Sequence, residues 1–242
     1  MRILVISDIH GNLTALEAVL KSAGNVDQTW CLGDLVGYGP DPNECIDKIK
    51  VIPNLTCLIG NHDSAALGQI DLQAFNQDAR VSISWMKSKL KADSLKFLRS
   101  MSDKKVVEEI TLVHGSPRDP IWEYMLDVHT AAENFGYIEK KICLVGHTHI
   151  PITFSLQKDG LTIDWEMVEA GQIYRLNKKC FLNPGSVGQP RDHDPRAAYA
   201  FLDTERNTWQ PMRIEYDVES VQKRILKAGL PRKHAARLSS GG

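Results

Sequence analysis

The sequence lacks a Cys-x-x-Cys pair, an apolar run long enough to span a membrane, and an excess of charge of one sign. Its five cysteines are odd in number and several lie within apolar stretches, which indicates small buried side chains in a reducing compartment. Its 29 basic and 30 acidic residues leave a formal net charge of -1, so no overall field attracts polyanions or anionic lipid. We therefore expect a cytoplasmic protein that binds neither long nucleic acids nor membranes.

What the sequence does contain is an alternation of short apolar runs and helical patterns. The β-branched run at residues 2–6 and the runs at 28–32 and 55–59 predict buried strands, with amphipathic helices between them. This order predicts a parallel sheet with right-handed crossovers. The strand pattern resumes at 109–113 and 141–145. Because the first strand leads directly into polar loop residues, no signal peptide is expected.

Two segments depart from that alternation. Residues 64–105 have helical spacing and predict a helical insertion, which either walls the site or only packs on one face of the sheet. Beyond residue 151, short strands separated by turns predict a second, mostly antiparallel sheet packed on the first. We expect one domain over residues 1–230 and a disordered tail over 231–242.

Polar side chains that can bind metal ions follow the predicted strands by one to four residues. They are Asp8, His10, Asp34, Asn61, His62, His114, His147 and His149. Because the carboxyl ends of parallel strands share one edge of a sheet, these loops are expected to meet there. Any one histidine is as well explained by a structural role, but the set points to a single site.

The donor types favour a particular metal chemistry. Carboxylate, amide and imidazole donors without thiolates suit a first-row divalent ion such as Mn, Fe, Ni or Zn. The donors are too many for one ion, so we expect two ions about 3.5–4 Å apart, which clamp the attacking and leaving oxygens of an in-line displacement. The expected reaction is attack of a metal-bridging hydroxide on phosphorus.

The motifs, taken in order, resemble the calcineurin-like metallophosphoesterase superfamily. They are Asp8-x-His10, Gly33-Asp34, Gly60-Asn61-His62-Asp63, Val113-His114-Gly115 and Gly146-His147-Thr148-His149. The later segment 183–191, with the sequence NPGSVGQPR, resembles the small bacterial and archaeal phosphodiesterase branch. This resemblance implies an α/β (α+β) fold with a two-sheet, β-sandwich-like core flanked by helices, of which the predicted parallel sheet is one half.

The resemblance also implies roles for individual residues. The first ion would be bound by Asp8, His10, Asp34 and His149. The second ion would be bound by Asp34, Asn61, His114 and His147. Asp34 would bridge the two ions, for which manganese is the first choice. His62 would protonate the leaving oxygen, and Asp63 would orient and polarise His62.

The sequence leaves two possible roles open for each candidate substrate-binding residue. Arg118 and Arg191 could each hold a phosphate oxygen bidentately or form a structural salt bridge. Trp122 and Tyr124 could stack on a nucleobase, although core or rim packing is the more common role for aromatic residues in such loops.

The expected function is that of a dinuclear-metal-dependent phosphoester hydrolase, a phosphodiesterase or phosphatase, acting on a small nucleotide-like phosphoester. One alternative is a protein Ser/Thr phosphatase, but the chain has little extra sequence from which to build a peptide groove. Another is a non-catalytic scaffold of the same fold, but the presence of the full donor set and of His62 argues against it. Dimers are common in that branch, which leaves a homodimer as an alternative to a monomer.

Overall fold

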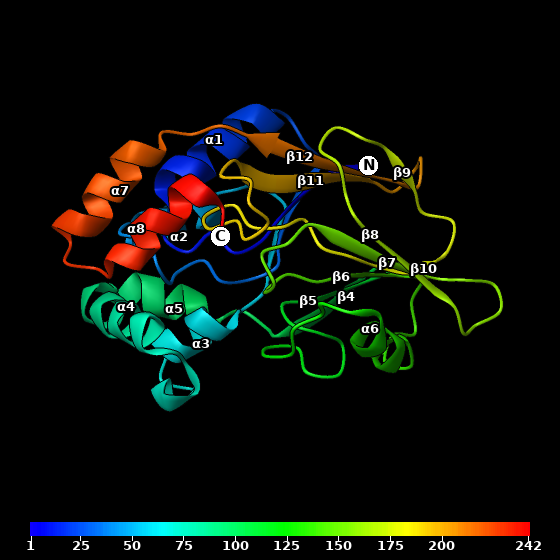
Figure 1. Cartoon of the computed structure of the whole chain (residues 1–242), viewed down its shortest axis with the longest axis horizontal. Helices are drawn as coiled ribbons and strands as arrows, with labels where there is room; N and C mark the ends of the chain where they lie inside the picture. Colours follow the sequence, from blue (N-terminus) through cyan, green and yellow to red (C-terminus); the bar gives the residue numbers. More distant parts are fainter.

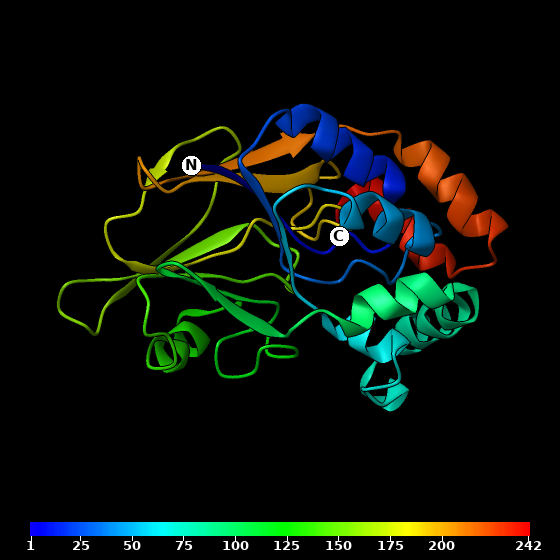
Figure 2. The ribbon, with the colours of Figure 1, turned by 180° about the vertical axis from the view of Figure 1, so that it is seen from behind.

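The computed structural model describes all 242 residues, which form two six-stranded mixed sheets stacked face to face (Figures 1 and 2). The first sheet has the order β3-β2-β1-β11-β12-β9. Its strands are β1 (Arg2–Ile6), β2 (Gln28–Cys31), β3 (Leu55–Cys57), β9 (Tyr174–Arg175), β11 (Ala197–Asp203) and β12 (Thr208–Ile214). The second sheet has the order β4-β5-β6-β10-β7-β8. Its strands are β4 (Lys104–Val107), β5 (Ile110–Val113), β6 (Ile142–Leu144), β7 (Ile152–Leu156), β8 (Ile163–Met167) and β10 (Lys179–Leu182).

Most helices gather at one end of the molecule, whereas α6 lies against the second sheet (Figure 1). The helices are α1 (Leu13–Ala23), α2 (Pro42–Lys50), α3 (Asn61–Ala66), α4 (Gln77–Lys89), α5 (Ala92–Arg99), α6 (Val128–Phe135), α7 (Val218–Lys227) and α8 (Arg232–Ser240), with a 3₁₀ turn at Leu72–Ala74. Segment 64–105 thus contains α4, α5 and the 3₁₀ turn. No helix is both long and apolar enough to cross a lipid bilayer.

The apolar run of β1 is explained by burial on both faces of its sheet. Ile3 and Val5 belong to the core between the two sheets, whereas Leu4 and Ile6 pack among residues of the helices that cover the outer face. A strand buried on both faces needs apolar residues at every position instead of an alternating pattern. The outer face of the second sheet has its own core, which includes Phe181 and, on α6, Phe135.

The two-sheet core is confirmed, but the strand-end loops do not share one sheet. β1, β2 and β3 are parallel, as predicted. β5 and β6 are parallel to each other in the second sheet. The expected separate antiparallel sheet is wrong, because β11 and β12 extend the first sheet and β7 and β8 extend the second. The repeated strand-helix order fixed local pairing but did not show where the chain changes sheets.

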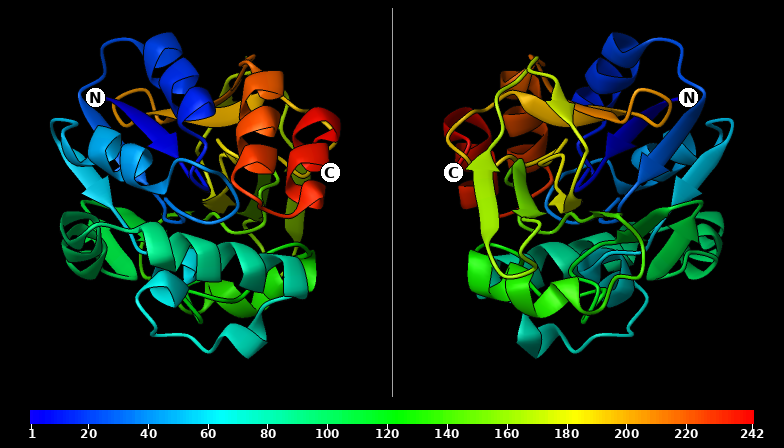
Figure 3. Two further views of the ribbon diagram at one scale, coloured as in Figure 1. Left: turned by 90° about the vertical axis from the view of Figure 1, so that its left-hand side faces the viewer. Right: turned by 90° about the vertical axis from the view of Figure 1, so that its right-hand side faces the viewer.

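The predicted disordered tail at 231–242 is wrong, because it forms helix α8. Ala235 and Leu238 are buried with Val221 and Ile225 of α7 in a small apolar cluster. The exposed basic residues suggested a solvated segment, but they occupy only the outer face of the helix. Helix α8 lies beside α4, far from it in sequence (Figures 1 and 3).

Candidate metal centre

The predicted metal-binding residues are brought together at one end of the two sheets. Loops after β1 and β2 carry Asp8, His10 and Asp34, Asn61 begins helix α3 after β3, and loops after β5 and β6 carry His114, His147 and His149. All of these side chains are buried. The predicted meeting of the loops therefore occurs, although across two sheets.

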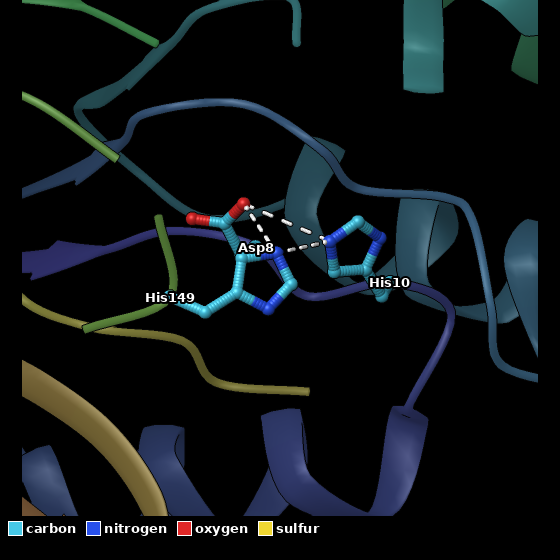
Figure 4. A group of neighbouring side chains, drawn as sticks. All are labelled: Asp8, His10 and His149. Atoms are coloured by element: carbon cyan, nitrogen blue, oxygen red, sulfur yellow. Dashed lines mark hydrogen bonds and ion pairs between the residues drawn. The ribbon is translucent and has the colours of Figure 1, made fainter. Parts of the chain in front are cut away.

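Three overlapping clusters of donor atoms define the centre. They are Asp8–His10–His149, His10–Asp34–His62 and Asp34–His114–His147, and in each the donor atoms lie within 4.8 Å of one another. Figure 4 shows the first cluster, in which the Asp8 carboxylate and the His10 and His149 rings point toward a common position. His10 and Asp34 each belong to two clusters, so the donors form one continuous group.

Distances within the group place an Asp34 oxygen between its two halves. Asp34 Oδ2 lies 3.6 Å from His10 Nε2 and 3.4 Å from His114 Nε2. On one side, His149 Nε2 lies 3.2 Å from Asp8 Oδ1. The arrangement is consistent with a dinuclear metal site.

The two carboxylates provide a direct test of whether metal ions fit. Asp34 Oδ1 accepts a hydrogen bond from the His62 backbone N–H (2.8 Å), and Asp8 Oδ2 accepts one from the His147 backbone N–H (3.1 Å). The other oxygen of each, Asp8 Oδ1 and Asp34 Oδ2, is buried without a hydrogen-bond partner. A buried charged oxygen is costly unless a cation or donor satisfies it. The residues therefore fit divalent cations.

The histidine rings are oriented by backbone carbonyls on their far sides. For three rings Nδ1 lies against a carbonyl oxygen, which leaves Nε2 facing the centre. These pairs are His10 with Val36 (3.2 Å), His114 with Leu32 (2.9 Å) and His149 with Gln189 (2.5 Å). His147 is reversed, with Nε2 against the Trp122 carbonyl (3.1 Å) and Nδ1 free to face the centre. A carbonyl that accepts the ring N–H fixes the tautomer and leaves the opposite lone pair for a metal.

The backbone at the centre adopts an unusual conformation. Five of the nine non-glycine residues with positive φ are candidate ligands: Asp8 (55°), His10 (49°), Asp34 (53°), His147 (63°) and His149 (62°). Left-handed backbone at a non-glycine residue costs on the order of 1–3 kcal/mol and is concentrated at functional sites. The neighbouring Gly60 is required sterically, because a Cβ there would overlap the Asp34 carboxylate.

Burial and nearby charge set the protonation of the metal-free centre. Burial lowers the pKa of His147 to about 3 and that of His149 to about 4, so both rings are neutral at pH 7. For His114 burial acts in the same direction, but the negative charges of Asp34 and Asp8 outweigh it and raise the pKa to about 9. The metal-free protein therefore holds a proton on His114 at pH 7, which a metal ion must displace.

We expect metal loading to release about one proton per chain from His114 at pH 7, since only the neutral imidazole binds metal. The His114 contribution to this release should disappear as pH rises through its pKa of about 9, whereas a proton lost from metal-bound water adds to the release at any pH where that water ionises. Titration calorimetry with manganese in two buffers of different ionisation enthalpy measures this release. Equal heats in both buffers at pH 7 would contradict it.

The contacts of Asp63 differ from its expected role as the group that orients His62. Its carboxylate accepts hydrogen bonds from the backbone N–H groups of Leu35 (3.3 Å), Val36 (3.1 Å) and Gly60 (3.0 Å). Burial and the Asp34 charge raise the Asp63 pKa to about 7. Asp63 thus joins the loops after β2 and β3. The His62 ring is instead held by Tyr38, whose hydroxyl lies 3.0 Å from Nε2.

The two candidate phosphate-binding arginines are placed differently. Arg118 forms ion pairs with Glu123 and Glu133 in the segment after β5, and these carboxylates occupy its guanidinium. The salt-bridge alternative therefore describes Arg118. Arg191 lies at the centre, with Nη2 3.3 Å from the Tyr38 hydroxyl and 3.2 Å from Gln189 Oε1.

Four aromatic side chains border the centre, and two of them were not anticipated. The Tyr124 ring stacks on His147 with 3.9 Å between centroids, and Phe75 packs edge-on against both His62 (5.1 Å) and Trp122 (5.0 Å). Trp122 and Tyr124 thus pack at the rim, the more common of their two predicted roles. Phe75 and Tyr38 were missed. The only signal for Tyr38 was the glycine-rich loop that contains it.

Comparison with known proteins places this centre in a defined class. Residues 1–207 match the model of the calcineurin-like phosphoesterase superfamily domain. The chain belongs to this superfamily, as its motifs indicated.

Individual relatives agree with that placement. An uncharacterized protein of Methanocaldococcus jannaschii is 39% identical over 252 residues, covering 99% of this chain and 98% of its own. The crystal structure of a metallophosphoesterase from Sphaerobacter thermophilus has a TM-score of 0.91 and 41% identity, covering 100% of this chain and 99% of its own. The phosphodiesterase YfcE of Escherichia coli K12 is 24% identical over 85% of this chain and 89% of its own.

Proposed function

We propose that the chain is a dinuclear-metal-dependent phosphoesterase acting on a small, nucleotide-like phosphoester. One observation carries the proposal: two buried carboxylate oxygens without partners face imidazole nitrogens whose far sides are fixed by backbone carbonyls. Membership of the calcineurin-like superfamily and similarity to a phosphodiesterase support hydrolysis of a phosphoester bond.

The donors divide into two sets that share Asp34. One set is Asp8, His10, Asp34 and His149, and the other is Asp34, Asn61, His114 and His147. Divalent ions bound there would polarise phosphoryl oxygens and make a nucleophile available from water at neutral pH. We propose manganese, since oxygen and imidazole donors without thiolates suit it, with iron, nickel and zinc as competitors.

His62 is proposed to give a proton to the leaving oxygen. The ring is buried beside Asp34, whose backbone-facing oxygen accepts from the His62 main-chain N–H. Burial lowers the His62 pKa well below its usual 6.5, and the Asp34 charge opposes that shift. A phosphoester anion bound nearby would also oppose the effect of burial, because an opposite charge stabilises the protonated ring.

Arg191 is proposed to hold a phosphate oxygen. Its side chain lies beside Tyr38, and Nε is buried without a hydrogen-bond partner. A guanidinium with unused donors suits bidentate contact with a phosphoryl group.

Two other functions remain as competitors. A yeast protein Ser/Thr phosphatase shares the fold with a TM-score of 0.51 but only 10% identity, so this likeness concerns the fold alone. A scaffold without catalysis is the other alternative, and the fully assembled donor group argues against it.

The deciding experiment strips the full chain with chelator, reloads it with manganese, and compares turnover of four substrates. These are a chromogenic phosphodiester, a phosphomonoester, a dinucleoside polyphosphate and a phosphoserine peptide. We expect metal-dependent turnover of small esters and little of the peptide. Preference for the peptide would favour a protein phosphatase, and absence of bound metal would favour the scaffold.

A further inference from the structure

The hydroxyl of Tyr38 joins the two groups proposed to handle the substrate. It lies 3.0 Å from His62 Nε2 and 3.3 Å from Arg191 Nη2. Tyr38 belongs to the loop between β2 and α2 and is only 7% exposed. The proton donor and the phosphate-binding cation are therefore held against one oxygen atom, which fixes their separation.

The Tyr38 ring is held by packing on several sides. Its centroid lies 4.6 Å from that of His10, 4.5 Å from that of His62 and 4.7 Å from that of His234. Gly37, at φ +150°, permits the close approach, because a Cβ there would overlap the His10 ring. Aromatic rings in such contacts attract one another beyond the effect of simple burial. The hydroxyl thus has a defined position in this loop.

The third ring comes from helix α8, which lies beyond residues 1–207 matched by the superfamily model. His234 is buried, and its Nε2 lies 3.3 Å from the Asp78 carbonyl oxygen of α4. Figure 3 shows one end of α8 approaching α4, with α7 packed next to α8. The C-terminal helix is thereby fixed to the helical segment after β3 and backs the Tyr38 ring.

We propose that Tyr38 is a positioning residue that sets His62 and Arg191 for the phosphoester, and that helix α8 keeps Tyr38 in place through His234. This inference rests on the proposed function. If the hydroxyl is lost, His62 can rotate and Arg191 can withdraw. Small misplacements of a reacting group can cost up to about 100-fold in rate.

The test compares Tyr38→Phe with Tyr137→Phe, a control at an exposed tyrosine on the surface. Each manganese-loaded variant is assayed on two matched phosphoesters, one with a p-nitrophenyl and one with an alkyl leaving group. Proton donation matters most for the poor leaving group, so Tyr38→Phe should lower kcat on the alkyl ester about tenfold more than on the p-nitrophenyl ester. KM should rise on both because Arg191 is loosened. Tyr137→Phe should match the wild type.

A readout without turnover separates positioning from catalysis. In metal-free protein labelled with ¹⁵N-histidine, the His62 Nε2 resonance should shift in Tyr38→Phe, because its hydroxyl partner is gone. His234→Ala should reproduce the selective kcat loss in smaller measure, and His234→Phe, which keeps a ring, should restore it. Metal content should stay unchanged throughout.

Two results would overturn the inference: equal losses on both esters in Tyr38→Phe, or an unchanged His62 resonance. A wild-type protein that binds metal but hydrolyses neither ester would instead count against the proposed function. The resonance would then still decide whether Tyr38 orients His62.

Discussion

Asp34→Asn is expected to bind at most one manganese ion per chain and to lose about 10³-fold or more in kcat. The reason is the position of Asp34 Oδ2, which faces His10 and His114 and has no hydrogen-bond partner. An amide removes the charge that balances two cations. A loss of about 4 kcal/mol of transition-state stabilisation corresponds to about that factor.

Metal analysis of the dialysed protein and turnover of the chromogenic diester measure both effects. Asp93→Asn is a matched control, because Asp93 is exposed in α5, and it should retain the metal content and rate of the wild type. If Asp34→Asn kept two ions and normal turnover, Asp34 could not be the shared ligand.

His62→Ala is expected to keep both ions and to lose about 10²–10⁴-fold in kcat on an ester with a poor leaving group, the usual contribution of a positioned acid. The loss should be much smaller on a p-nitrophenyl ester, whose leaving oxygen needs little help from a proton. His62 contacts the Tyr38 hydroxyl through Nε2, beside Arg191, where a leaving group would be placed.

Metal content decides between two roles for His62, since its ring also falls in a donor cluster with His10 and Asp34. Loss of one ion in His62→Ala would make it a ligand and leave the proton donor unassigned. His129→Ala serves as the control, because the His129 side chain is 84% exposed and lies on the surface of α6.

The sequence predicted which loops form the centre, because each of them follows a buried strand. Polar, metal-binding residues that recur at the ends of several strands are difficult to explain by structural roles alone. The strand pattern predicted a second sheet packed on the first but assigned the wrong strands to it, and the superfamily resemblance implied the β-sandwich-like core. Strand periodicity could not assign β5 and β6 to the second sheet, because a short apolar run can form a buried strand in either of the two sheets. Sheet membership depends on non-local pairing, such as β10 between β6 and β7.

Helix α8 and Tyr38 were missed for different reasons. In α8 only His234, Ala235 and Leu238 are buried, too few to stand out among basic residues. Tyr38 is defined by three-dimensional contacts with His62 and Arg191, which no spacing reveals. Arg118 was instead wrongly considered as a candidate, because it lies close to His114 in the sequence but its guanidinium does not lie at the centre.

The division of donors between sheets has a mechanical consequence. Each proposed ion takes ligands from loops of both sheets, for example Asp8 with His149 and Asp34 with His114. A bound ion is thus a reversible cross-link that clamps the open ends of the sandwich together. Binding at 100 times Kd adds about 2.7 kcal/mol to the folded state. Chelation would release this clamp and loosen the sandwich first at the end where the strained ligand loops meet.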